Sequence, residues 1–175
     1  MPHEARDAIE RLSRSVEDFP TPGITFRDLS PVFADGPALR SVIDALVAPF
    51  AGEFDAIAGM EARGFVLAAG AAYATGLGCV MIRKPGKLPR GVISEDYDLE
   101  YGSTTLEVHP DELAPGTRVL LLDDVLATGG TLAASCSLVE RAGWRVAGIS
   151  VVLELSALNG VAKLTDRRVN TLLAI

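Results

Sequence analysis

The sequence is poor in the residue types that build metal centres, disulfide networks and nucleic-acid surfaces. Its 175 residues include two cysteines, two histidines and three lysines, and the net charge is −7. Cys79 and Cys136 lie in apolar stretches without metal-type spacing, and neither His3 nor His109 has a cysteine or histidine nearby. We therefore expect no metal site formed by protein side chains, reduced thiols in the core and a cytoplasmic location. The acidic balance argues against nucleic acid or an anionic membrane as partner.

The sequence also lacks a signal peptide and a convincing membrane span. The uncharged run at 65–82 is interrupted by Gly70, Gly76 and Gly78, whereas a spanning helix needs about 20 predominantly apolar residues. We expect a buried helix followed by a buried strand there. About half of the residues are apolar, so we predict a single globular domain over residues 1–175.

Most of the chain reads as repeated strand–loop–helix units. Such repeats predict an α/β fold, with a mainly parallel twisted sheet flanked by helices and right-handed crossovers. Two regions depart from this rhythm: a small N-terminal hood over about 1–34, and a β-hairpin or mobile flap over about 91–109. The expected strands are 56–59, 79–83, 119–122, 144–154 and the edge strand 169–174. The expected helices are about 5–16, 38–50, 65–74, 132–142 and 156–164.

The segment 119–131, with the sequence VLLLDDVLATGGT, organises the rest of the chain. Four apolar residues in a row predict a strand buried on both faces, and ligands bind outside the carboxyl ends of such strands. Gly129 and Gly130 let backbone N–H groups approach an anion at the start of a helix. With the hydroxyls of Thr128 and Thr131, this pattern predicts a cradle for a monophosphate.

Asp123 and Asp124 precede this cradle. Carboxylates accept hydrogen bonds, so a sugar diol suits them and the whole segment suits a ribose 5-phosphate. A plainer interpretation is that the two acids end the strand and the glycines form a turn. The segment lacks the Gly-Lys-Ser/Thr ending of a P-loop and the Gly-x-Gly-x-x-Gly dinucleotide pattern. It resembles the phosphoribosyl pyrophosphate (PRPP) signature of type I phosphoribosyltransferases. That resemblance implies that the acids hold the ribose hydroxyls and that residues 127–131, Ala-Thr-Gly-Gly-Thr, hold the 5-phosphate.

The basic loop at 83–90 holds four of the sixteen basic residues in an acidic chain. A solvated loop is one explanation. A second anion beside the phosphate cradle is another, and pyrophosphate is that anion if PRPP is the donor. Lys84, Lys87 and Arg63 can carry its charge together with Mg²⁺.

The loop at 18–28, Asp-Phe-Pro-Thr-Pro-Gly-Ile-Thr-Phe-Arg-Asp, is unusual for a linker. Phe26 can be an ordinary core residue. The flanking prolines, however, fix the backbone, and a rigid backbone beside an aromatic ring can recognise the edge and the face of a planar base.

Five segments together resemble the adenine phosphoribosyltransferase family, over roughly residues 17–155. This resemblance implies that Phe26 stacks on adenine while the backbone of Thr25 and Arg27 binds its edge, and that Val125 packs on the base. It assigns Arg63 to the border between base and pyrophosphate. The segments are 18–31, 59–65, 83–89, 98–109 and 119–131.

The same resemblance places Glu100 and Tyr101 on a closing flap, with Glu100 the candidate acceptor of the adenine proton. It assigns Lys84 and Lys87 to pyrophosphate. Pro85 departs from the family pattern, in which a second basic residue is common, so we expect more reliance on Lys84, Lys87 and Arg90.

The implied reaction is purine salvage: adenine and PRPP give AMP and pyrophosphate, with Mg²⁺ held mainly through PRPP and water. Catalysis is assigned to Glu100, Arg63 and Lys84, and closure of the flap at 96–105 would exclude water. The resemblance also implies a homodimer.

Two alternatives remain. One is transfer to a 6-oxopurine, namely xanthine, hypoxanthine or guanine. A 6-oxo group needs a donor, often lysine, and the only lysine outside the predicted site loops is Lys163. The other is a non-catalytic PRPP-sensing regulator, against which the acidic charge and the absence of an added basic domain argue.

Overall fold

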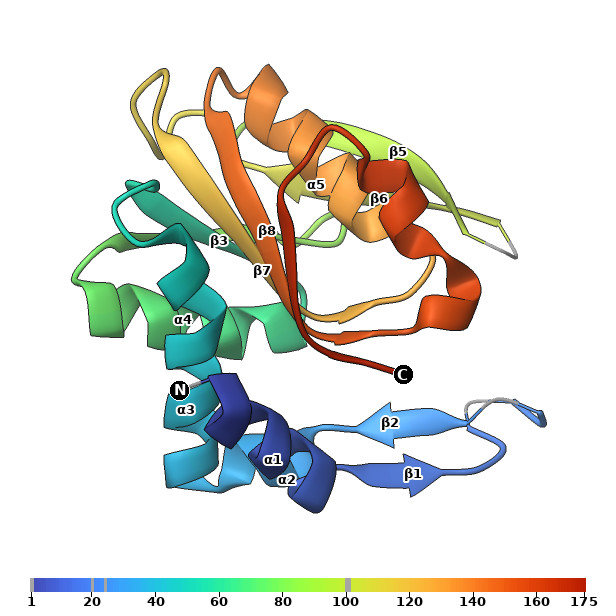
Figure 1. The fold of residues 1–175 in the computed structure, drawn as a ribbon. Coiled ribbons are helices and arrows are strands. Elements are labelled where there is room, and N and C mark those ends of the chain that lie inside the picture. Colours follow the sequence, from blue (N-terminus) through green and yellow to red (C-terminus); the bar gives the residue numbers. More distant parts are fainter. Residues whose placement is uncertain (1, 20, 24, 100–101) are drawn as a thin grey trace.

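A five-stranded parallel sheet forms the centre of the computed structural model, which describes residues 2–19, 21–23, 25–99 and 102–175 (Figure 1). The strand order is β4-β3-β7-β8-β9, and each neighbouring pair is parallel. This arrangement confirms the predicted parallel α/β architecture. The strands are β3 (Ala56–Met60), β4 (Gly78–Ile82), β7 (Arg118–Leu126), β8 (Arg145–Glu154) and β9 (Val169–Ala174).

Helices cover both faces of this sheet (Figure 1). Alternate residues of a strand point to opposite faces, so Ile57 and Leu120 enter one core while Ala58 and Leu121 enter the other. The first core packs against α1 (Pro2–Leu12), α2 (Ser30–Ala34), α3 (Gly36–Val47) with the short 3-10 turn η1 (Ala48–Phe50), and α4 (Arg63–Thr75). The second packs against α5 (Gly130–Arg141).

The strand predicted from four apolar residues, 119–122, lies in the middle of the sheet as part of β7. All four side chains are fully buried. The run is apolar because helices cover β7 on both faces of the sheet, as predicted. The unbroken run also directs the two acids that follow it to the carboxyl edge of the sheet.

The N-terminal hood contains a short strand within the segment that the helical spacing assigned to the first helix. The predicted helix at 5–16 ends at Leu12, and β1 (Arg14–Val16) pairs antiparallel with β2 (Phe26–Asp28). The Arg27 guanidinium donates to Ser13 Oγ at 2.9 Å and to Ser15 Oγ at 2.8 Å. These contacts across the hairpin outweigh the helical pattern, which Val16 fits only by coincidence.

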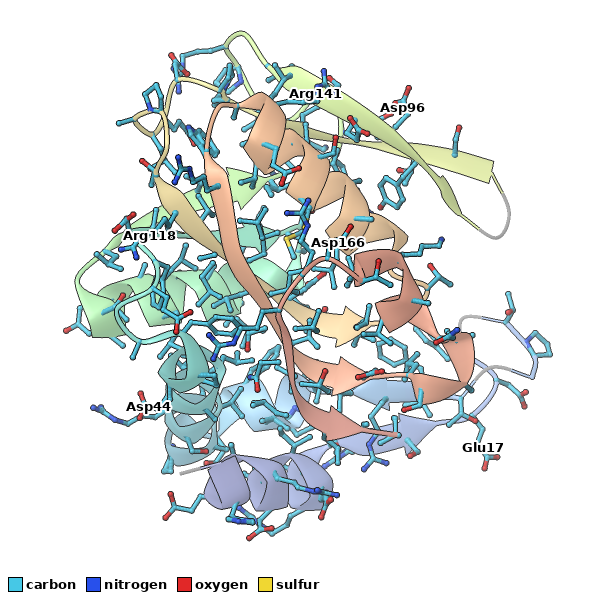
Figure 2. The ribbon with its side chains drawn as sticks, turned by 45° about the horizontal axis from the view of Figure 1, so that its top comes forward. Glu17, Asp44, Asp96, Arg118, Arg141 and Asp166 are labelled. Carbon is cyan, nitrogen blue, oxygen red and sulfur yellow. The ribbon has the colours of Figure 1, made fainter. Side chains whose placement is uncertain are left out.

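The flap is a hairpin, as predicted. Strands β5 (Ile93–Leu99) and β6 (Gly102–Val108) pair antiparallel, and Thr105 Oγ1 donates to Asp96 Oδ1 at 2.6 Å. Its base is fixed by reciprocal backbone hydrogen bonds between Arg83 and Glu107, of 2.9 and 2.8 Å. It lies beside α5, as the labels of Asp96 and Arg141 in Figure 2 indicate.

Two further expectations need correction, and one helix was missed. Residues 156–164 form two 3-10 turns, η2 (Ser156–Leu158) and η3 (Gly160–Leu164), because Asn159 between them is left-handed. Cys79 is exposed on the edge strand β4, whereas Cys136 is buried as expected. The short helix α2 was not predicted. Within the described part of the chain, no helix has both the length and the apolar character that crossing a bilayer requires.

Candidate active site

A cavity of about 480 Å³ opens at the carboxyl ends of β3 and β7. It brings together predicted residues from three separate segments, since Arg63, Lys84 and the acid pair all line it. This is the edge at which parallel sheets bind ligands. The lining residues are Glu61, Ala62, Arg63, Lys84, Tyr97, Thr104, Leu106, Asp123, Asp124 and Thr131.

The predicted phosphate loop leads from β7 into α5 and surrounds a smaller hollow of about 60 Å³. Gly129 has φ +79°, and a Cβ there would lie 2.3 Å from the carbonyl oxygen of Gly160. Glycine is therefore required by conformation and by space. Because α5 starts at Gly130, an anion bound in the loop would meet its unpaired N–H groups and its positive end. The hollow is lined by residues 125–132, which include Val125, Ala127, Thr128, Gly129, Gly130 and Thr131.

Gly160 is a part of this site that sequence reasoning missed. A Cβ on Gly160 would lie 2.1 Å from the carbonyl oxygen of Ala127. The phosphate loop and η3 thus meet backbone to backbone, and η3 supports the loop from behind. No local pattern signals this contact, because the two glycines are separated by a helix and a strand.

The acid pair is buried in the carboxyl-terminal half of β7. The Asp124 N–H donates to Asp123 Oδ1 at 2.9 Å. Burial, and then the charge of neighbouring Asp124, raise the pKa of Asp123 well above its ordinary value. Gly64 leaves room for this carboxyl, since a Cβ there would lie 3.0 Å from Asp123 Oδ1.

Arg63 connects the two halves of the site. It begins α4, and its Nε donates to Asp124 Oδ2 in an ion pair. The same guanidinium lies over the ring of Phe26, 5.4 Å from its centroid. The Phe19 ring meets Phe26 edge to face at 5.3 Å. The residue predicted to stack on a base is therefore held beside the residues predicted to hold a ribose.

Glu61 is a second residue that sequence reasoning left without a role. Its Oε2 accepts from the Lys84 backbone N–H at 3.1 Å and from Arg83 Nε at 3.2 Å. Burial opposes ionisation, but these two donors outweigh it and lower the pKa of Glu61. The ionised carboxylate thus holds the start of the basic loop against the cavity. An acid directly after a buried strand, as at Asp123, is the signal that could have identified it.

The basic loop contributes less to the cavity than expected. Lys87 is exposed and does not line the cavity, although its carbonyl accepts from Arg83 at 3.3 Å. Arg90, on which pyrophosphate binding was expected to rely, is paired with Asp111 at 2.8 Å and Glu112 at 3.4 Å. In this structure its charge is paired away from the cavity, so its contribution to pyrophosphate binding stays a prediction.

The remaining predicted residues lie as follows. Thr25 is exposed just before β2, and the side chain of Arg27 is engaged within the hood, which leaves only its backbone for the predicted base contact. Glu100 and Tyr101 lie outside the described residues. Lys163, expected outside every site loop, lines a hollow beside the flap and the start of α5.

Comparison with known proteins agrees with this geometry. A family model for the phosphoribosyl transferase domain matches residues 35–171. The adenine phosphoribosyltransferase of Renibacterium salmoninarum is 61% identical over 97% of this chain and 93% of its own length. The crystal structure of the adenine phosphoribosyltransferase from Thermoanaerobacter pseudethanolicus aligns with a TM-score of 0.93 and 43% identity, over 97% of this chain and 99% of that one.

A third relative was solved with ligands. The adenine phosphoribosyltransferase of Saccharomyces cerevisiae, complexed with an imino-altritol bisphosphate and adenine, aligns with a TM-score of 0.92 and 34% identity, over 98% of this chain and 99% of that one. The predicted type I fold is thereby confirmed, and it defines the class as phosphoribosyltransferase. More narrowly, the chain belongs to the adenine phosphoribosyltransferase family.

Proposed function

We propose that this chain transfers the 5-phosphoribosyl group of PRPP to adenine, giving AMP and pyrophosphate in purine salvage. The observation that carries the proposal is the junction at Arg63. It joins the acid pair and phosphate loop of a ribose 5-phosphate site to an aromatic ring suited to a purine. The names of the relatives support adenine over a 6-oxopurine or a sensing role.

The reaction would proceed at C1 of the ribose. The bond from C1 to the pyrophosphate oxygen breaks while adenine N9 bonds to C1, through an oxocarbenium-like state. Asp123 and Asp124 would fix the ring through its hydroxyls, which positions C1 for attack. Arg63 and Lys84 line the same cavity and would stabilise the negative charge that develops on the leaving group.

The proton of the adenine ring needs an acceptor. We assign it to Glu100, with Tyr101 beside it, from the family resemblance. Closure of the flap over 96–105 would exclude water, which otherwise hydrolyses PRPP. Thr25, Phe26, Arg27 and Val125 would hold the base.

Magnesium is part of the proposal. The described residues contain no group of three or more histidine, cysteine or acidic side chains suited to a metal ion, so its ligands would come mainly from PRPP and water. The donor set fits this arrangement, since Asp123 and Asp124 offer acceptor oxygens to the hydroxyls and waters around the ion. When bound, Mg²⁺ neutralises charge on pyrophosphate.

We further propose a cytoplasmic homodimer. Val66 and Tyr73 lie seven residues apart on one face of α4, and Tyr73 is 93% exposed. Met81 is exposed on β4, the edge strand on the side of α4. A second copy would cover this apolar surface. Sedimentation should give a dimer that Tyr73→Glu weakens. The exposed thiol of Cys79 fits a reducing compartment.

The test of function is PRPP consumption with Mg²⁺ and each of adenine, hypoxanthine, guanine and xanthine. Turnover with adenine alone, forming AMP, is expected. Turnover with a 6-oxopurine instead would discard the base assignment and keep the ribose 5-phosphate site. PRPP binding without turnover would indicate a sensor.

A further inference from the structure

A hydrogen bond between side chains links the described part of the flap to the phosphate loop. Tyr97 is on β5, and its hydroxyl lies 3.1 Å from Oγ1 of Thr131, in the first turn of α5. The Tyr97 ring is half-buried and packs against the core on the α5 side of the sheet. The hydroxyl is therefore held in place by the packing of its ring.

The same ring separates two hollows. Tyr97 lines the main cavity of about 480 Å³ and also a second hollow of about 270 Å³ behind the hairpin. The second hollow is lined by Glu95, Asp96, Tyr97, Gly130, Ala133, Ala134 and Lys163. The Tyr97 side chain thus forms a wall of the proposed PRPP site at the place where the flap meets the loop.

A second attachment holds β5 to the other end of α5. Arg141 Nη1 donates at 2.6 Å both to the carbonyl of Ser94 and to Glu95 Oε2. Between them, Arg141 and Thr131 fix residues 94–97 along the helix.

We propose that Tyr97 is a positioning residue that couples occupancy of the 5-phosphate site to the flap. The inference deepens the proposed function and rests on it. Each hydroxyl has a single hydrogen to donate. A phosphate in the loop accepts the Thr131 hydrogen, so Tyr97 must then donate to Thr131. A bound phosphate thereby orients both hydroxyls and fixes the root of the flap.

This coupling makes a selective prediction. Ligands that carry the 5-phosphate, namely PRPP, AMP and ribose 5-phosphate, depend on the Tyr97 hydroxyl. The binding of adenine and of pyrophosphate does not depend on this hydroxyl, because neither ligand carries the 5-phosphate that would accept from Thr131. A purely structural role for Tyr97 would affect all of these ligands alike.

The test compares Tyr97→Phe with the wild-type protein. The variant keeps the ring and its packing, so we expect an unchanged Tm. The KM for PRPP and the inhibition constant of ribose 5-phosphate should rise about three- to tenfold, as for loss of one hydrogen bond. The KM for adenine should stay within about twofold. Thr117→Val removes a hydrogen-bonded hydroxyl at the surface, before β7 and away from the cavity, and is the control.

A double-mutant cycle with Thr131→Val completes the test. In the Thr131→Val background, adding Tyr97→Phe should not weaken the binding of ribose 5-phosphate any further. Additive losses, or equal losses for adenine and ribose 5-phosphate, would overturn the coupling. If Thr131→Val does not fold, Thr131→Ser keeps the hydroxyl and should retain the full Tyr97→Phe effect. Failure of the wild type to use adenine would instead refute the proposed function, while ribose 5-phosphate calorimetry would still test Tyr97.

Discussion

Arg63 and Asp124 form an ion pair that spans the candidate site, from the first residue of α4 to the carboxyl-terminal half of β7. The guanidinium also covers one face of Phe26. A ribose whose hydroxyls bind Asp124 and a purine that stacks on Phe26 would both compete for groups that Arg63 now contacts. Binding of the proposed substrates would therefore exchange the contacts that Arg63 makes with Asp124 and Phe26.

Arg63→Lys tests this central position. A lysine keeps the charge but cannot pair with a carboxylate and stack on a ring at the same time. We expect kcat/KM for adenine to fall at least about tenfold, with folding unchanged. Steady-state kinetics with both substrates varied will measure it. Wild-type efficiency in the lysine variant would show that charge alone is sufficient.

Gly129→Ala tests the phosphate loop, and the chain supplies a matched control. Gly129 and Gly116 have φ of +79° and +81°, but only at Gly129 would an added Cβ meet a backbone atom, at 2.3 Å. Gly116→Ala should cost only about 1 kcal/mol of unfolding free energy, from the left-handed backbone. Gly129→Ala should cost more and raise the KM for PRPP about tenfold or more. Equal effects in urea unfolding and in kinetics would contradict the close approach.

Asp123→Asn tests the raised pKa of the buried acid. The ordinary pKa of an aspartate is about 3.9, and that of Asp123 in the folded protein is higher because of burial and of Asp124. Between these values the folded state holds more protons than the unfolded state, so the contribution of Asp123 to stability falls as pH rises. Asparagine does not ionise, so the variant does not lose this stability as the pH rises. The unfolding free energy of Asp123→Asn relative to wild type should therefore increase as the pH rises from about 4 towards neutral.

Denaturant unfolding of both proteins across that range is the measurement. A difference that does not change with pH would show that Asp123 titrates normally. Activity gives a second outcome, because the asparagine NH₂ cannot accept from a ribose hydroxyl. We expect kcat/KM for PRPP to fall about tenfold or more.

Glu61→Gln tests how the basic loop is held. Glutamine loses the charge that pairs with Arg83 and orients the Lys84 backbone. The KM for pyrophosphate in the reverse reaction should rise about fivefold, because Lys84 is less well positioned. The control is Glu53→Gln, which breaks an exposed pair with Arg168 and should leave kinetics unchanged. A similar KM for pyrophosphate in both variants would show that Glu61 does not position Lys84 for pyrophosphate binding.

The strands and acids of the site could be predicted because their signals are local. The apolar run at 119–122 predicts a strand that is buried on both faces, and Asp123 and Asp124 follow it directly. The roles of Glu61 and Tyr97 could not, because their partners lie far along the chain. Glu61 meets Arg83 over 22 residues, and Tyr97 meets Thr131 over 34. Such contacts depend on the order of strands in the sheet, which local periodicity does not encode.

At β1 a local pattern was present but gave the wrong prediction. Val16 continues the helical spacing, yet the helix ends at Leu12, and Arg27 binds both Ser13 and Ser15 across the hairpin. The exposed residues of β1 carry no periodic signal of their own. A short polar strand of this kind is defined by its partner rather than by its own sequence.

The close approach of Gly129 and Gly160 links η3 to the predicted phosphate loop. Backbone touches backbone there, so a change of length or stiffness in 156–164 shifts the loop whichever side chains it carries. Protein engineers who wish to tune substrate affinity without altering a ligand-contacting side chain can work from this remote turn. Insertions at the same place are correspondingly constrained.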